Sequence, residues 1–339
     1  MSKRPLRKTI YSAIYIAVCL FAASLIVSKQ QAQAALNSQV MGMHIMQTGE
    51  LEQFRQVYKD EEWRYVTIPF TFADLQKKKE WQDFMDQAEK MRVIPILRLS
   101  TGFDQSINAW KIPTRKNIID MADFLAKLDW HQDEKFIIVF NEVNHAAEWG
   151  GKVDPLLYGG ILQFTSYWFH SEGCNFKILP AAMDLAANNS AITREAFGYL
   201  ESLIQFHPDI FDSIDYWNSH SYPNPDFAAS PKRIGQNSVR GFLYELTWLK
   251  NKTGKDFQVM ITETGWASSY LTNYSLDDYY FYALNYIWSD KRVKAVTPFI
   301  MKGSPGPFAS FSFFDAQGNP TVQLFSLQKA MKSYDALTF

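Results

Sequence analysis

The stretches KFIIVFNEV (135–143) and FQVMITETG (257–265) each place a glutamate at the end of a short apolar run. Such runs, rich in β-branched and aromatic residues, are typical of strands buried on both faces. The chain contains six more: QVMGMHIM (39–46), RYVTIPF (64–70), VIPILRLS (93–100), FKILPAAMD (176–184), SIDYWNSHSY (213–222) and KAVTPFIMK (294–302). We therefore expect eight buried strands.

Helical patterns separate these strands, with apolar residues recurring at three- and four-residue spacing. They include WQDFMDQAEKM (81–91), NIIDMADFLAKL (117–128), YGGILQFTSYWF (158–169), ITREAFGYLESLIQF (192–206), GFLYELTWLK (241–250) and DDYYFYALNYIW (277–288). Alternation of strand and helix predicts parallel strands, and eight units close a barrel. A doubly wound sheet would need a glycine-rich loop after its first strand, which is missing here. We expect an α/β protein, a single (β/α)8 TIM barrel over residues 36–339.

Polar residues gather where these strands end. In a barrel of this kind, the loops that follow the strands build the active site. From the first strand to the eighth, the candidates are His44, Arg98, Asn141, Glu142, Asp184, His220, Tyr222, Glu263 and Lys302. We expect these side chains to surround one mouth of the barrel.

Glu142 and Glu263 end the fourth and the seventh strand, so they should face each other across the mouth. Glycoside hydrolysis needs such a pair, because one carboxylic acid protonates the departing oxygen while a carboxylate acts at the anomeric carbon. Like charge across a short gap would keep one of the two protonated near neutral pH. Either glutamate alone could equally be the partner in a structural ion pair.

Three motifs resemble the clan of (β/α)8 retaining glycosidases with catalytic glutamates on strands four and seven, the GH-A clan. They are NEVN (141–144), SHSYP (219–223) and ITETGW (261–266). The resemblance implies that Glu142 is the acid/base and Glu263 the nucleophile, and that Asn141 binds a sugar hydroxyl. It also implies that Tyr222 donates to the nucleophile and that His220 lines the acid/base side. β-Linked oligosaccharides or polysaccharides are the substrates it implies.

The sequence departs from the clan pattern at several positions. Val143 stands where many members have proline, and no tryptophan ends the eighth strand. Trp266, Trp217 or Trp149 could supply a stacking face instead. Arg98 could hold Glu263 ionised or form a salt bridge at the rim. Asp184, Lys302 and His44 could bind hydroxyls, and for Asp184 and Lys302 the alternative is again a rim ion pair.

The N-terminus has the pattern of an export signal. Four basic residues precede the apolar run at 11–27, and Ala32-Gln33-Ala34 offers small residues for cleavage. We expect residues 1–34 to be a signal peptide, or residues 11–27 to be an uncleaved membrane tether. Either segment would place the enzyme outside the cytoplasm, secreted or membrane-anchored.

Several other classes of function lack their signals. The formal net charge of -1 provides no field for nucleic acid. No HExxH spacing, serine elbow or phosphate loop is present, so we expect no metal and no cofactor, and neither a lyase nor an esterase. A carbohydrate-binding barrel without activity should have lost one glutamate, whereas this chain has both. Transglycosylation uses the same chemistry as hydrolysis and stays open.

Overall fold

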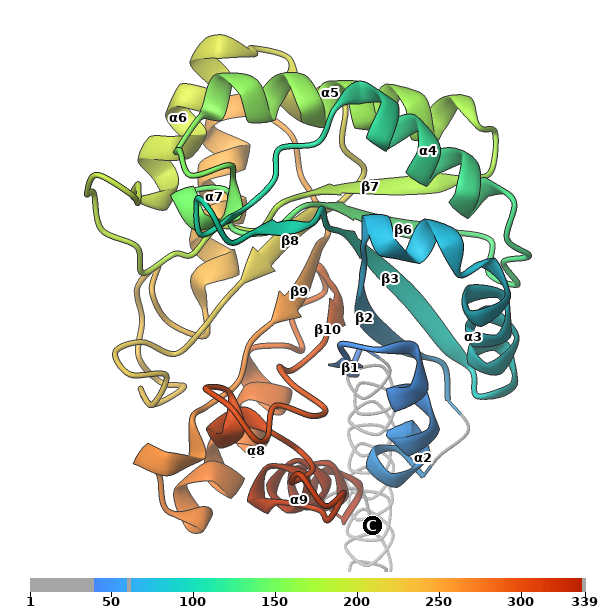
Figure 1. Cartoon of the computed structure of the whole chain (residues 1–339). Coiled ribbons are helices and arrows are strands. Elements are labelled where there is room, and N and C mark those ends of the chain that lie inside the picture. Colours follow the sequence, from blue (N-terminus) through green and yellow to red (C-terminus); the bar gives the residue numbers. More distant parts are fainter. Residues whose placement is uncertain (1–39, 60–61, 337–339) are drawn as a thin grey trace, which may run out of the picture.

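The computed structural model describes residues 40–59 and 62–336, and the predicted signal or anchor segment lies outside them. Eight parallel strands lie at the centre of the molecule (Figure 1). They are β1 (Gly42–His44), β2 (Arg64–Phe70), β3 (Val93–Leu99), β6 (Lys135–Val139), β7 (Phe176–Pro180), β8 (Trp217–His220), β9 (Val259–Glu263) and β10 (Val293–Val296). Among the described residues, no helix combines the length and apolar character needed to cross a bilayer.

The strands form two sheets that meet at two seams. One sheet has the order β1-β2-β3-β6-β7 and the other β10-β9-β8. A parallel bridge between Met41 and Val296 joins β1 to β10, and one between Asp184 and His220 joins the ends of β7 and β8. Each strand therefore has a neighbour on both sides, which is the (β/α)8 barrel that the sequence predicts.

Helices form a layer around the strands, and α8 and α9 lie side by side (Figure 1). The helices are α2 (Phe54–Val57), α3 (Lys78–Lys90), α4 (Arg115–Ala126), α5 (Pro155–Ser171), α6 (Ala196–Phe206), α7 (Gly241–Thr253), α8 (Asn273–Tyr286) and α9 (Val322–Ala336). The six helices expected from the sequence are all present. A short hairpin of β4 (Phe103–Asp104) and β5 (Ala109–Trp110) was not expected.

The barrel interior changes from apolar to polar along its axis. Alternate residues of a strand face inward, and they form an apolar layer that includes Tyr65, Ile96, Phe136, Leu179 and Met260. The next inward positions carry hydroxyls and amides. The Thr262 hydroxyl donates to Asn218 at 2.6 Å, and the Thr67 and Thr297 hydroxyls lie 2.8 Å apart. The polar groups at the carboxyl end of the barrel therefore lie above a buried apolar layer.

Glu245 of α7 is a buried carboxyl that packs against β8. The Ser219 hydroxyl donates to its Oε2 at 2.5 Å, and burial raises the pKa of Glu245 from 4.5 to about 7. The folded protein therefore binds one more proton than the unfolded chain between these two values. Stability is thus lost as the pH rises from 4.5 to 7, since ionisation of this buried group opposes folding.

We expect Glu245→Gln to remove this loss. From pH 5 to pH 8, the unfolding free energy of wild type should fall by about 2 kcal/mol relative to that of the variant. The variant escapes this loss because it carries no ionisable group at position 245. Urea unfolding at both pH values measures the change, with exposed Glu52→Gln as the control. Parallel stability curves for wild type and Glu245→Gln would contradict the prediction.

Candidate active site

Glu263 points into the barrel because β9 is irregular at its end. Ser219 of β8 pairs with Ile261, but the next residue, His220, pairs with Glu263. This register shift places one extra residue, Thr262, in β9. A bulge of this kind re-aims the side chain that follows it. As a result, Thr262 and Glu263 both face the interior, whereas strict alternation would send one of them outward.

Glu142 follows β6, the fourth barrel strand, through an unusual backbone. The strand ends at Val139, and Phe140 and Glu142 have φ values of 72° and 29°. Residues other than glycine rarely adopt positive φ, and each such residue costs on the order of 1–3 kcal/mol. The predicted strand over 135–143 is therefore shorter than expected, and its last residues form a strained turn that carries Glu142.

Glu263 lies among groups that stabilise its negative charge. Arg98 donates to Oε1 at 2.7 Å and the Tyr222 hydroxyl donates to Oε2 at 3.1 Å. Burial raises the pKa of Glu263, but the charges of His220 and Arg98 and the hydrogen bond from Tyr222 outweigh burial and lower the pKa below its usual 4.5. Burial in turn lowers the pKa of His44 to about 3, so His44 is neutral at ordinary pH. Arg98 and Tyr222 are thus the direct partners of an ionised Glu263.

Glu142 pairs with a histidine instead of an arginine. Nδ1 of His220 lies 2.8 Å from Oε1 of Glu142 and 3.7 Å from Oε2 of Glu263. Burial lowers the pKa of His220, but the two glutamates outweigh burial and raise the pKa above 6.5. About a quarter of the Glu142 side chain is exposed, against 11% for Glu263. Glu142 therefore lies against the His220 ring, on the side of the site that solvent reaches.

The two carboxylates are close together. One oxygen of Glu142, one of Glu263 and a ring nitrogen of His220 all lie within 4.8 Å of one another. Three such atoms could surround a cation, but the guanidinium of Arg98 already occupies Glu263 Oε1 and would repel one. The arrangement suits two carboxylates that act from opposite sides of a bond.

Comparison with known proteins gives matches in structure alone. No protein-family model and no curated protein matches the chain. A family 39 glycoside hydrolase from Bacteroides cellulosilyticus WH2 has a TM-score of 0.59 at 14% identity, over 88% of this chain and 64% of its own. The chain has the fold of the GH-A clan of glycoside hydrolases. This chain spans less than two-thirds of the family 39 enzyme.

Two other clan structures match over most of both chains. An endo-1,4-β-mannanase from Rhizomucor miehei has a TM-score of 0.52 at 11% identity, over 88% of this chain and 95% of its own. A β-glucanase from Saccharophagus degradans, solved with cellotetraose, has a TM-score of 0.51 at 12% identity, over 89% of each chain. Identities this low support the shared barrel and leave the chemistry to the residues themselves.

Several of the other predicted site residues lie beside the two glutamates. Asn141 accepts a hydrogen bond from Arg98 at 2.8 Å, and Nδ1 of His44 lies 3.7 Å from Glu263. Asp184 lies beside His220, but its carboxylate pairs with His145 at 2.9 Å. Asp184 therefore forms the rim ion pair that the sequence left open.

Lys302 and Trp266 do not contact the glutamates among the described residues. Lys302 is exposed, and its charge acts on Glu50. Trp266 is fully buried, with its indole N–H donating to Ala229 O at 2.9 Å. The expectation that Trp266 stacks on a sugar is wrong, because its ring packs against Tyr280 and offers no free face. Trp149 and Trp217 are buried in the same way.

Glu148 is a third carboxyl near the site that the sequence did not reveal. It ends η3 (Ala146–Glu148), in the loop that follows Glu142. It lines a small cavity together with Asn141, Ser100 and Lys111. Burial, assisted by the negative charge of Glu142, raises its pKa to about 7. No residue pattern separates a half-buried loop glutamate from an exposed one, so only the structure shows this environment.

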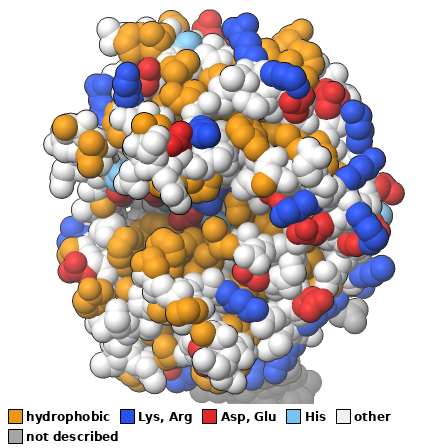
Figure 2. Space-filling model, viewed as in Figure 1, with side chains coloured by type: hydrophobic (Ala, Val, Ile, Leu, Met, Phe, Trp, Pro, Cys, Tyr) orange, Lys and Arg blue, Asp and Glu red, His pale blue; other side chains and the backbone are white. Residues whose placement is uncertain are grey.

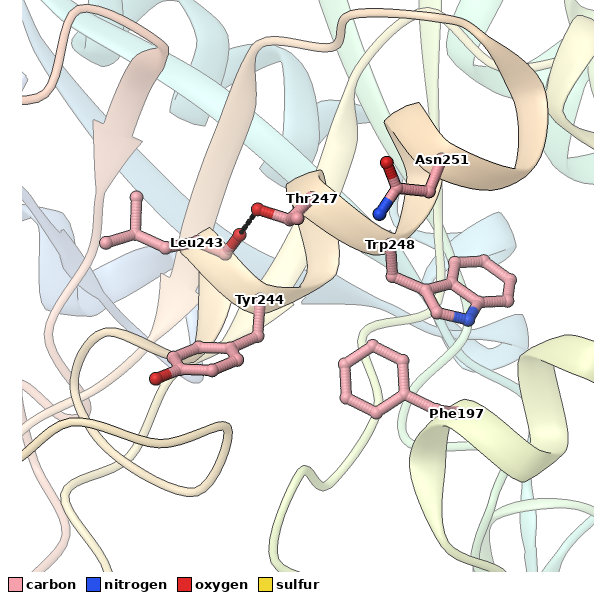
Figure 3. Close-up of a pocket in the computed structure, with 6 residues that line it drawn as sticks. All are labelled: Phe197, Leu243, Tyr244, Thr247, Trp248 and Asn251. Atoms are coloured by element: carbon pink, nitrogen blue, oxygen red, sulfur yellow. Dashed lines mark hydrogen bonds between the residues drawn. The ribbon is translucent and has the colours of Figure 1, made fainter.

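A separate hollow of about 510 Å³ lies between α6 and α7 (Figure 3). Phe197, Tyr244 and Trp248 turn their rings toward it, and Leu243, Thr247 and Asn251 complete its lining. It contains no carboxylate and shares no residue with the barrel mouth, so it offers no groups for bond cleavage.

Proposed function

We propose that the protein is a retaining O-glycoside hydrolase. The observation that carries the proposal is the distance of at most 4.8 Å between an oxygen of Glu142 and one of Glu263. Retaining enzymes have carboxyl groups about 5–5.5 Å apart, whereas inverting enzymes leave about 6.5–9.5 Å for a water molecule. The space between these two glutamates suits direct attack by a carboxylate.

In the first half-reaction, Glu263 attacks the anomeric carbon while Glu142 donates a proton to the departing oxygen. The glycosidic bond breaks, a covalent glycosyl-enzyme forms, and the aglycone leaves as an alcohol. In the second, Glu142 accepts a proton from water, which attacks the anomeric carbon and releases Glu263. Two displacements return the original anomeric configuration. A sugar hydroxyl in place of water would make the same steps a transglycosylation.

The roles follow from the surroundings of each carboxylate. Arg98 and Tyr222 keep Glu263 ionised and aimed, which a nucleophile requires. Glu142 has a hydrogen-bond partner in His220 and access to solvent, which suits an acid/base.

The substrates that we propose are β-linked oligosaccharides or polysaccharides. The family resemblance supports this class, as do matching structures of a β-glucanase and an endo-1,4-β-mannanase. The basic and apolar N-terminus supports a location outside the cytoplasm, secreted or tethered by residues 11–27. A binding barrel without activity is less well supported, because such a protein has no need of a strained, paired Glu142.

Hydrolysis of aryl β-glycosides and of plant and microbial polysaccharides tests the proposal. Proton NMR of the first product formed reports its anomeric configuration before mutarotation. We expect the β-anomer from a β-linked substrate. An α-anomer would show that the enzyme inverts instead of retaining. Inactivity on every substrate would contradict the proposal that the protein is an enzyme.

The pH dependence should report the two kinds of carboxylate. Because the pKa of Glu263 is lowered below its usual 4.5, activity should persist into acid. The pKa of His220 is raised above 6.5, so activity should fall at higher pH, where the His220 ring beside Glu142 loses its proton. Glu148, ionised above about pH 7, helps to retain this proton by its negative charge. Glu148→Gln should therefore move the basic limb of kcat/KM down by on the order of one pH unit.

Exposed Glu52→Gln is the matched control for the pH profile and should leave both limbs in place. A basic limb that moves up in Glu148→Gln, or that stays where it is in wild type, would show that Glu148 does not act on the His220 proton.

A further inference from the structure

An aromatic cluster follows β8 and β10 at the barrel mouth. Phe299 and Phe311 are nearly buried, while Phe227 is 38% and Phe308 48% exposed. We call the two exposed rings, Phe227 and Phe308, the aromatic shelf. Figure 2 shows hydrophobic side chains gathered along one edge of the hollow in the face displayed. Exposed phenylalanine rings cost solvation free energy, so a pair at a functional site points to a ligand.

Each shelf ring reaches the carboxylates through one or two intervening side chains. The Phe227 ring lies 5.1 Å from the ring of Tyr222, whose hydroxyl donates to Glu263. On the other route, the Phe308 ring lies 5.0 Å from Phe299, whose ring contacts His44. The two shelf rings are therefore linked to the carboxylates and, through the ring of Phe311, to each other.

The backbone holds both shelf rings in place. Phe227 has a φ of 54°, a costly value for a bulky residue, and its carbonyl accepts from the Ala267 amide at 2.9 Å. The Phe308 carbonyl accepts from the Phe311 amide at 3.0 Å, and the Phe311 carbonyl accepts from Ile300. Strain that the fold maintains beside a reactive site indicates a binding role.

We propose that the aromatic shelf binds a second sugar unit, next to the one held between Glu142 and Glu263. This inference rests on the proposed function and adds which side chains hold the sugar next to the one that is cleaved. The C–H face of a β-linked pyranose is flat and apolar, so it covers a phenyl ring while its hydroxyls stay in water. The buried Trp266 leaves this stacking role to phenylalanines.

The test compares substrates that reach the shelf with one that does not. In Phe227→Ala and Phe308→Ala we expect kcat/KM on hexasaccharides of β-1,4-glucan or β-1,4-mannan to fall by about tenfold each, since the loss of one aromatic contact is of that size. A β-glycosyl fluoride of one sugar occupies only the space at the carboxylates, so its hydrolysis should fall much less than that of the hexasaccharides. Phe227→Tyr keeps the ring and should keep hexasaccharide activity. Phe206→Ala, which removes a ring that is 47% exposed on α6, is the matched control.

The outcomes separate the shelf from the proposed function. An equal loss on hexasaccharide and fluoride, or no loss on either, would overturn the shelf. If wild type hydrolyses nothing, the proposed function fails. Isothermal titration of the hexasaccharides into wild type and Phe227→Ala then tests whether the shelf binds sugar, independently of catalysis. Weaker binding to the variant supports it, and equal binding or none to wild type overturns it.

Discussion

Glu263→Ala is expected to lower kcat/KM by about 10⁴-fold or more on every substrate, whatever its leaving group. The carboxylate forms the covalent bond to the anomeric carbon, and among the described residues no other carboxylate occupies its place between Arg98 and Tyr222. Arg98 and Tyr222 would remain, but both donate hydrogen bonds and neither attacks carbon. Initial rates on aryl glycosides with good and poor leaving groups measure the effect.

Azide distinguishes a lost nucleophile from a lost fold. In Glu263→Ala it can enter the space of the carboxylate and attack the anomeric carbon directly. A single displacement inverts, so a β-glycoside should yield the α-glycosyl azide. Circular dichroism and thermal unfolding check that the variant folds, because removal of Glu263 leaves Arg98 without its anion. Near-normal rates in a folded Glu263→Ala would end the proposed mechanism.

The fold was predictable because it depends on a repeated pattern. Eight apolar runs that alternate with amphipathic helices leave few topologies, and RYVTIPF (64–70) matches β2 residue for residue. Strand ends were harder to place. KFIIVFNEV looks like one strand of nine residues, but positive φ at Phe140 and Glu142 ends β6 at Val139. Backbone dihedrals of this kind depend on the packing around them and leave no mark on hydrophobic periodicity.

Site residues at the ends of strands could be predicted from the sequence, whereas site residues in loops could not. His220, Tyr222 and Glu263 follow from their place on strands, although the register shift that turns Glu263 inward does not. The prediction that Trp266 stacks on a sugar was wrong, because the sequence does not distinguish an exposed tryptophan ring from one buried in the core. Phe227 was missed for the same reason, since an exposed and a buried phenylalanine look alike in the sequence.

The effect of Glu142→Ala on activity should depend on the leaving group of the substrate, whereas the effect of Glu263→Ala should not. A poor leaving group needs a proton, so its kcat/KM should fall by about 10²–10⁴-fold. An activated aryl group departs as a stable anion, so formation of the glycosyl-enzyme should survive. Its hydrolysis should then become slow, because no carboxylate accepts a proton from water. A burst of aryl alcohol followed by a slow steady rate is the expected kinetic result.

Azide added to Glu142→Ala should restore steady-state turnover, because azide is already an anion and needs no base. It attacks the glycosyl-enzyme on Glu263 from the face that Glu142 occupied, so two displacements give the β-glycosyl azide from a β-glycoside. The conservative Glu142→Gln keeps the shape of the side chain beside His220 and should show the same division by leaving group. Proton NMR of the azide product decides the assignment. An α-azide from Glu142→Ala together with a β-azide from Glu263→Ala would exchange the roles of the two glutamates.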